Sequence, residues 1–444
     1  MGDIMPAVNP KSVHEVLGRH ILADGFEPII DLEKSHGSWL VDGRDGREYL
    51  DFFSMFASMP VGYNHPRIME AKDRFATVAS NKPTNSDVYS SQMAEFVDTF
   101  FDIAIPDHFA YAFFIEGGTL GVENALKAAF DWKVKKNAAR NGKMGEVGTQ
   151  VIHFKECFHG RSGYTLSLTN TADPRKTDHF PKFDWPRIVN PKVTFPLDEE
   201  NLSAVKRVED EALDQIKSVI KANGSDIASL IIEPIQGEGG DNFFRKEFLQ
   251  ALRVICDENE IMLIFDEVQT GVGLTGKMWA WEHFDVAPDL MTFGKKTQVC
   301  GCVSSRRIDE VPDNVFKESS RINSTWGGNL TDMVRSTIYL EIIKKENLLD
   351  AAADQGKYLK THMQSLQEEF PELVINPRGL GLMCAFDLPT VAQRDDLAGK
   401  IIENGVFILG SGEKAIRFRP PLNISRDELD TGMEIVRTSM KQLY

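Results

Sequence analysis

Two residues at the ends of apolar runs could together perform chemistry on an amine. Asp266 follows the run IMLIF, and Lys295 follows the run DLMTFG. In an open α/β sheet the ligand crevice lies outside the carboxyl ends of the strands, so both side chains are expected there. A desolvated lysine near other cations can form an imine with an aldehyde. A carboxylate can keep a pyridine nitrogen protonated, as an electron-sink cofactor requires.

A glycine-rich turn could supply the phosphate site of such a cofactor. Gly117, Gly118 and Thr119 precede a helical pattern over 120–138. A turn of small residues before a helix exposes backbone N–H groups to an anion, and the helix dipole favours the negative charge. The turn, the carboxylate and the lysine occur in the order, and at the strand ends, that a pyridoxal-phosphate site needs.

Each feature has a simpler interpretation when it is taken alone. Glycine-rich turns start many ordinary helices, and a strand-ending aspartate such as Asp266 can simply cap a turn. Because lysines are mostly exposed, Lys295 and Lys296 could be an ordinary surface pair. Only the combination favours one shared site.

The elements that must position these residues predict a largely parallel sheet. Apolar runs at 151–154, 229–234, 261–267 and 289–294 are continuous rather than alternating, which is typical of strands buried on both faces. Helical patterns separate them. This alternation over roughly 200 residues indicates a large, doubly wound α/β domain.

The two ends of the chain have a different pattern. The segment SWLVDGRDGREYLDF predicts a β-hairpin around Asp45-Gly46. From about 330 the pattern predicts a helix, strands within RGLGLMCAFDL and KAIRFRPPL, and a last helix with Ser425 and Glu428 as a capping box. We therefore predict three segments, namely 1–70 as the N-terminal part of a small domain, 71–328 as the large α/β domain, and 329–444 as the C-terminal part of the small α+β domain.

Composition excludes several classes of protein. The chain has 444 residues, and its net charge of −16 argues against a general nucleic-acid binder, since phosphate contacts need a basic surface. The N-terminal sequence MGDIMPAVNPKSVHEV has no apolar run long enough for a signal peptide or a membrane span. We expect a cytoplasmic protein that binds neither membranes nor nucleic acid. Its five cysteines are expected to be reduced, and Cys300 and Cys302 lack further ligands at metal-binding spacing.

Longer motifs resemble a known family. DGREYLDFFSMFASMPVGYNHP, FHGRSG, IIEPIQGEGGDNFF, FDEVQTGVGLTGK, MTFGKK and STWGGN resemble segments of the class III (ω-amino acid) aminotransferases, and the resemblance extends from about Gly37 to Pro421. It implies pyridoxal 5'-phosphate as cofactor and the aspartate-aminotransferase-like α/β fold, fold type I. That fold has a large doubly wound domain with a mostly parallel sheet and a small α+β domain built from both chain ends. Lys295 would then bind the cofactor and serve as general base, and Asp266 would hold the pyridine nitrogen protonated.

The resemblance implies further cofactor ligands. These are Gly118 and Thr119 at the phosphate, Phe158 stacked on the ring, Gln269 at the ring hydroxyl, and Thr325 at the phosphate of the opposite subunit. The match at Thr325 implies a homodimer with shared sites. Many members carry a serine in the phosphate turn, where this chain has Glu116-Gly117-Gly118-Thr119, so backbone rather than hydroxyl contacts are expected there.

The resemblance also suggests the substrates. FHGRSGYTLSLTNT, FPKFDWPRI, FGKKTQVCG and NSTWGGNLTDMVR are most similar to members that transfer the terminal ε-amino group of L-lysine to 2-oxoglutarate. The products would be 2-aminoadipate semialdehyde, which cyclises to piperideine-6-carboxylate, and glutamate. One alternative is 4-aminobutyrate or another ω-amino acid as donor. A different alternative is a cofactor-binding regulator without catalysis, against which the intact Lys295, Asp266 and Gln269 argue.

Two arginines and a glutamate are expected to handle these substrates. Arg161 would bind the α-carboxylate of lysine or the γ-carboxylate of 2-oxoglutarate, and Arg417 would bind the carboxylate beside the reacting carbon. Glu238 would pair with Arg417 and swing aside for 2-oxoglutarate, with Gly237, Gly239 and Gly240 allowing its loop to move. Asn323 is also predicted to bind substrate. Arg419 is expected at the surface or in a dimer interface.

Overall fold

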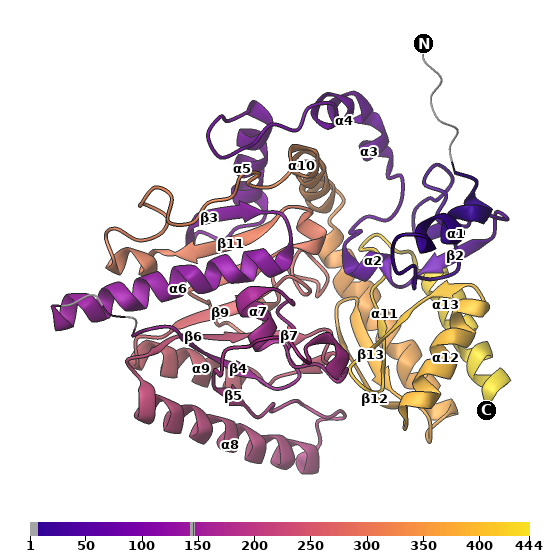
Figure 1. Ribbon diagram of the computed structural model, residues 1–444. Helices are drawn as coiled ribbons and strands as arrows, with labels where there is room; N and C mark the ends of the chain where they lie inside the picture. Colours follow the sequence, from indigo (N-terminus) through magenta and orange to yellow (C-terminus); the bar gives the residue numbers. More distant parts are fainter. Residues whose placement is uncertain (1–7, 143–144, 146) are drawn as a thin grey trace.

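A large sheet forms the centre of the protein. The computed structural model describes residues 8–142, 145 and 147–444 (Figure 1). The sheet has seven strands in the order β3-β11-β10-β9-β6-β4-β5. They are β3 (Phe109–Ile115), β11 (Cys300–Ser305), β10 (Leu290–Phe293), β9 (Met262–Asp266), β6 (Ile227–Ile232), β4 (Gln150–Phe154) and β5 (Arg187–Ile188). Neighbours from β10 to β5 pair in parallel, and β11 is antiparallel to both of its neighbours.

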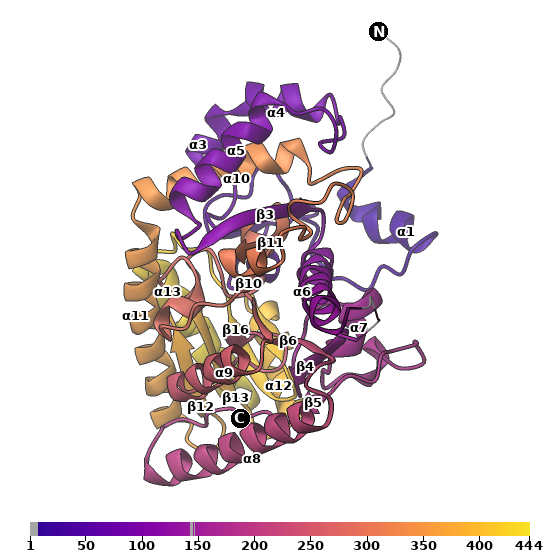
Figure 2. The ribbon, with the colours of Figure 1, turned by 90° about the vertical axis from the view of Figure 1, so that its left-hand side faces the viewer.

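Helices cover both faces of this sheet, as a doubly wound fold requires. On β9, Met262 and Ile264 pack in the cluster that contains α6 (Gly118–Asn141), whereas Leu263 and Phe265 pack in the cluster that contains α9 (Lys246–Glu258). Figure 2 shows α6 and α9 on opposite sides of the strands. The remaining helices of this part are α4 (Lys72–Ala79), α5 (Ser91–Ile103), α7 (Gly163–Leu168) and α8 (Glu199–Asn223). The four predicted strands and the mostly parallel sheet are confirmed.

Both chain ends contribute to a smaller part. A three-stranded sheet joins β1 (Trp39–Val41) and β2 (Glu48–Asp51) to β14 (Val406–Phe407). The hairpin predicted around Asp45-Gly46 is present, with Trp39 opposite Leu50. A second, antiparallel sheet has the order β12-β13-β16-β15, and its strands are β12 (Ile375–Leu380), β13 (Met383–Asp387), β16 (Ala415–Phe418) and β15 (Leu409–Ser411).

Helices from the C-terminal part of the chain complete the molecule. They are α10 (Leu330–Lys345), α11 (Leu348–Glu369), α12 (Val391–Glu403) and α13 (Arg426–Leu443), and α13 begins with the predicted capping box of Ser425 and Glu428. Helix α10 packs against α5 and α4 of the large part. The short elements are α1 (Val13–Gly18), α2 (Ser54–Ala57), α3 (Pro66–Glu70), β7 (Ile235–Gln236) and β8 (Asn242–Phe243). The exact domain boundaries stay a prediction.

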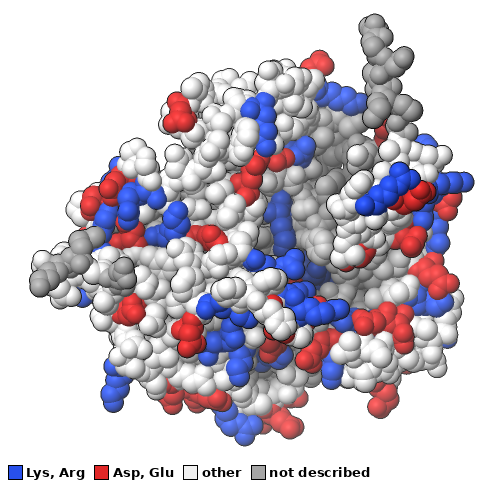
Figure 3. All heavy atoms as spheres, in the orientation of Figure 1, with Lys and Arg blue, Asp and Glu red and all other residues white. Residues whose placement is uncertain are grey.

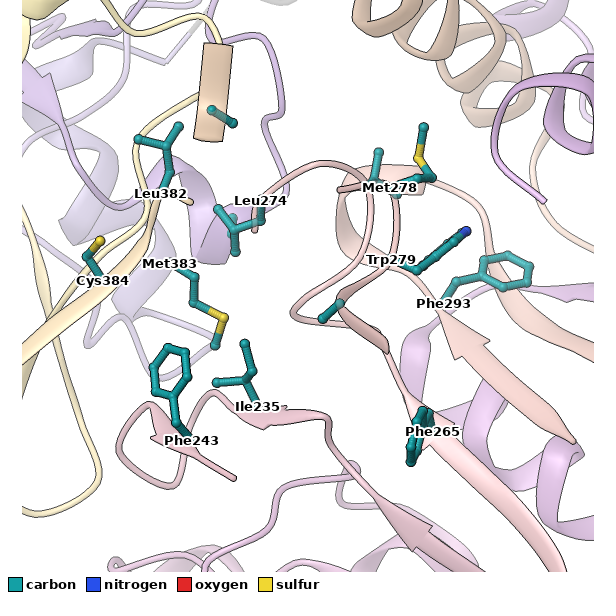
Figure 4. Packing of buried hydrophobic residues seen from close by; sticks show 14 of the residues in the cluster. Ile235, Phe243, Phe265, Leu274, Met278, Trp279, Phe293, Leu382, Met383 and Cys384 are labelled. Carbon is teal, nitrogen blue, oxygen red and sulfur yellow. The ribbon is translucent and has the colours of Figure 1, made fainter. Parts of the chain in front are cut away.

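One apolar core joins the large and small parts. Leu382 precedes β13 and Met383 is its first residue, and these two lie beside Leu274 and Ile235 of the large part (Figure 4). All four are at most 1% exposed. Since burying one such side chain contributes about 1.5–3 kcal/mol, this contact holds the small sheet in a fixed position against the large one.

Two further features concern the cysteines and the helices. All five cysteines are free and buried. Among the described residues, no helix combines the length and the apolar character needed to cross a membrane.

Candidate active site

The carboxyl ends of the parallel strands border a pocket of about 470 Å³. Figure 3 shows Lys and Arg side chains gathered around a hollow in the centre of the face that it displays. The pocket brings together most of the predicted site residues, which are Gly118, Thr119, Phe158, Arg161, Glu238, Asp266, Gln269 and Lys295. It is also lined by residues that the sequence had not marked, among them His159, Ser162 and Glu233.

Lys295 presents its amine to this pocket directly after β10. Its Nζ donates a hydrogen bond of 2.6 Å to Oε1 of Gln269. Its backbone lies in the left-handed region, with φ of 51°, a strained conformation that is common at functional sites. Burial, followed by the charge of Arg417, lowers the pKa of the Lys295 amine to about 8. About a tenth of such an amine is neutral at pH 7, which makes it a usable nucleophile or base.

The neighbouring Lys296 has a structural role. Its side chain is buried, and its Nζ donates to the backbone carbonyls of Gln269, at 2.8 Å, and Ala57, at 3.3 Å. The interpretation of the two lysines as an exposed pair is therefore wrong. Burial lowers the pKa of the Lys296 amine well below its ordinary value, and the two carbonyls fix this side chain in place while Lys295 faces the pocket.

Asp266 is the last residue of β9, and its carboxylate is held on several sides. Oδ1 accepts hydrogen bonds from Oγ1 of Thr292, at 3.0 Å, and from the backbone of Val268, at 3.1 Å. Oδ2 lies 2.8 Å from Nδ1 of the buried His159. Burial opposes a charge on His159, but Cys157 and Asp266 outweigh it and raise the pKa of this imidazole. Through this contact, His159 fixes the orientation of the Asp266 carboxylate. It was missed because a buried histidine partner depends on tertiary contacts, although it stands within the FHGR motif.

The start of α6 forms an anion cradle. Gly117 has φ of 98°, and the N–H groups of the first helical turn, at Gly118 and Thr119, have no acceptor within the helix. Oγ1 of Thr119 lies 3.1 Å from Oγ of Ser162. A side chain at Gly160 would place its Cβ 2.1 Å from Oγ1 of Thr119, so glycine is required there. This close approach fixes the first turn of α6 against the FHGR loop.

The pocket fits pyridoxal phosphate by the chemistry of its groups. The N–H groups of α6 suit a phosphate, the half-buried Phe158 suits the face of a pyridine ring, and Asp266 suits the ring nitrogen. Within the described part of the chain, Nε2 of Gln269 is a buried donor without a hydrogen-bond partner, which suits the ring oxygen. The amine of Lys295 suits the aldehyde.

Two buried arginines lie near Lys295 without lining the pocket, namely Arg417 on β16 and Arg419 directly after this strand. Arg417 is 6% exposed, and burial, followed by the nearby charge of Arg419, lowers the pKa of its guanidinium to about 10. Arg419 is 1% exposed and forms an ion pair with the fully buried Asp241. The expectation that Arg419 lies at the surface or in a dimer interface is wrong, because its charge is compensated inside the protein.

Glu238 differs from the expected arrangement. Its Oε1 forms an ion pair with Lys176, and no hydrogen bond joins it to Arg417 among the described residues. The glycines beside it also differ from the hinge that we predicted. A Cβ at Gly239 would lie 1.9 Å from the carbonyl oxygen of Glu156, and one at Gly237 would lie 2.6 Å from Cγ of Gln269. These glycines allow close packing of the loop rather than its movement.

The remaining predicted residues lie elsewhere. Asn323 and Thr325 are exposed residues of the segment between β11 and α10, outside the pocket lining. Arg161 lines the pocket and is exposed at its mouth.

A larger cavity of about 560 Å³ lies on the other side of the Glu238 loop. Four of its charged lining residues form ion pairs with one another, Arg378 with Asp387 and Lys192 with Glu156. The chemistry of the Lys295 pocket, rather than size, identifies the candidate active site.

Comparison with known proteins shows the family to which the chain belongs. The family model described as Aminotransferase class-III matches residues 22–440. The L-lysine-epsilon aminotransferase of Mycobacterium tuberculosis is 52% identical over 434 residues, which cover 97% of this chain and 96% of that protein. The 4-aminobutyrate aminotransferase of Dictyostelium discoideum is 34% identical over 431 residues, which cover 93% of this chain and 85% of that protein.

A solved structure has the same fold. It is the lysine aminotransferase from M. tuberculosis in the internal aldimine form, which is 51% identical, with a TM-score of 0.95 over 98% of this chain and 100% of that chain. From this match, the family model and the geometry around Lys295, we conclude that the chain belongs to the class III aminotransferases, the family of fold type I whose cofactor is pyridoxal phosphate.

Proposed function

We propose that this protein transfers the ε-amino group of L-lysine to 2-oxoglutarate, as a cytoplasmic homodimer with shared active sites. The products are glutamate and 2-aminoadipate semialdehyde, which loses water on cyclising to piperideine-6-carboxylate. The observation that carries the proposal is the Lys295 amine, which has a lowered pKa and lies close to the buried Arg417 and to the pocket that Arg161 borders. The choice of lysine over 4-aminobutyrate is supported by identities of 52% and 34% to the respective relatives.

Lys295 and Asp266 have different roles in the proposed reaction, which follow from their charges. When bound, pyridoxal phosphate supplies the electron sink for the carbon that loses a proton. Nζ of Lys295, once free, takes that proton from the terminal carbon of lysine, for which a pKa near the working pH is favourable. Asp266, oriented by His159, would lie at the ring nitrogen of the bound cofactor and favour its protonated form.

Carboxylate binding completes the cycle. Arg161, at the pocket mouth, would bind the α-carboxylate of lysine, which is distant from the reacting ε-carbon. That end of lysine brings no carboxylate to Arg417, so Glu238 would supply the compensating charge during this half of the reaction. In the return half, 2-oxoglutarate would bring its own carboxylate to Arg417, and Glu238 would turn away. Losing one partner of a buried ion pair costs about 3–5 kcal/mol, which favours such an exchange of partners by Glu238.

The donor is tested by mixing the holoenzyme with one amine at a time and following conversion of the cofactor from its aldehyde to its amine form by absorbance. L-lysine, L-ornithine, 4-aminobutyrate and N-acetylornithine are compared. We expect lysine to react fastest, by roughly tenfold or more over ornithine, because one methylene in a fitted pocket is worth that much. A faster reaction of 4-aminobutyrate or ornithine would contradict the assignment, and no reaction with any amine would favour the non-catalytic regulator.

A pH dependence follows from the lowered pKa of Lys295. Capture of free pyridoxal phosphate by the apoenzyme needs the neutral amine, and a pKa of about 8 gives roughly 300-fold more of it at pH 7 than the ordinary 10.5. We expect the capture rate to rise about tenfold from pH 6 to pH 7 and to level off above about pH 8. Nα-acetyl-lysine, treated with the cofactor over the same range, corrects for titration of the cofactor. A rate that keeps rising to pH 10 would show that Lys295 has an ordinary pKa.

The shared site is tested with mixed dimers of Lys295→Ala and Thr325→Ala chains. If Thr325 serves the opposite subunit, one site carries both lesions and the other carries neither, so the mixed dimer should show about half of the wild-type activity. The matched control mixes Lys295→Ala with Asp266→Ala, whose side chains belong to one pocket, and should recover nothing. Absence of recovery in the first mixture, with subunit exchange verified, would count against sharing.

A further inference from the structure

The Glu238 carboxylate lines the pocket and interacts with two cations, Lys176 and Arg417. Its Oε1 pairs with Nζ of Lys176, at the end of a short helix over Pro174–Lys176, and the two side chains are 28% and 30% exposed. Its charge also helps to keep the buried Arg417 protonated. Within the described residues, Oε2 of Glu238 is buried and has no hydrogen-bond partner. Oε1 thus forms the ion pair with Lys176, and Oε2 can still accept a hydrogen bond.

The backbone around Glu238 is fixed, so only its side chain is free to move. The N–H of Gly237 donates to the Glu233 carboxylate at 3.0 Å, and the N–H of Gly412 donates to the carbonyl of Glu238 at 2.7 Å. Asp241 ends the loop and is held by Arg419 and by Oγ of Ser411. An exchange of partners by Glu238 therefore has to be a rotation of the side chain between Arg417 and another cation.

We propose that Lys176 is this second cation and that it sets how readily the pocket accepts a dicarboxylate. The inference rests on the proposed function, in which Glu238 must leave Arg417 when 2-oxoglutarate arrives. A half-buried carboxylate without a cation is unfavourable, so the open state needs a partner for Glu238. Lys176 supplies it and thereby favours the acceptor half of the reaction over the lysine half.

The neighbouring cation provides a matched control. Arg175 precedes Lys176 directly but pairs with Asp173, through bonds of 2.8 and 3.0 Å, and its side chain is 88% exposed. Arg175→Met and Lys176→Met change the net charge equally at adjacent positions. An effect specific to Lys176 is therefore distinguishable from a general loss of positive potential at the mouth.

The test measures binding of glutarate, an unreactive five-carbon dicarboxylate, to the holoenzyme by titration calorimetry. We expect Lys176→Met to raise the Kd about fivefold, the range for a partly exposed ion pair, and Lys176→Arg to restore it. Arg175→Met should leave the Kd unchanged, and the melting temperature of each variant establishes that it is folded. An unchanged Kd in Lys176→Met, or an equal rise in Arg175→Met, would overturn the proposal.

The Glu238→Gln background separates an indirect role from direct attraction. If Lys176 acts through Glu238, adding Lys176→Met in this background should not change the Kd for glutarate. A persistent fivefold loss would mean that Lys176 attracts the dicarboxylate directly, and the proposal would fall. Kinetic measurements should agree with the binding data. Lys176→Met should raise the concentration of 2-oxoglutarate needed for saturation and leave the rate of the half-reaction with lysine unchanged.

The acceptor half can be started from enzyme reconstituted with pyridoxamine 5'-phosphate, so that it does not depend on the donor. Failure of lysine as donor would then leave the test of Lys176 intact.

Discussion

The burial of several positive charges at one edge of the sheet is the constraint on which the site depends. Lys295, Lys296, Arg417 and Arg419 all lie near one another in the interior, and a buried cation is costly unless it is compensated. Arg419 is neutralised by Asp241, and Lys296 is held by backbone carbonyls. Lys295 and Arg417 are left with lowered pKa values and incomplete compensation. Lys295 and Arg417 are also the two to which the proposed function assigns the cofactor and a substrate carboxylate.

The fold maintains this arrangement by fixing the position of the small antiparallel sheet relative to the large sheet. Asp266 and Lys295 stand at the ends of adjacent parallel strands, which fixes their separation, whereas Arg417 comes from β16 in the small part. The apolar contact of Leu382 and Met383 with the large part therefore positions Arg417 relative to Lys295. A shift of the small sheet would move the arginine while leaving the cofactor residues in place.

Sequence patterns predicted the secondary-structure elements, which depend on neighbouring residues. They missed the contacts between residues that are far apart in the sequence. Strand ends, the hairpin and the last helix follow from periodicity and capping, and the structure contains them. Strand β11 was not predicted, because CGCVSS lacks the continuous apolar character of its neighbours. The burial of Arg419 depends on Asp241, 178 residues away, and the partner of Glu238 is 62 residues away. Charged residues are exposed by default, so only tertiary structure could correct these expectations.

The central claim is that the terminal ε-nitrogen of lysine, and not its α-nitrogen, is transferred to 2-oxoglutarate. It is tested most directly by supplying lysine labelled with ¹⁵N either at the ε-position or at the α-position and analysing the glutamate by mass spectrometry. The account predicts that the ε-label appears in glutamate and the α-label remains in the cyclised product. Transfer of the α-label, or of neither label, would contradict it.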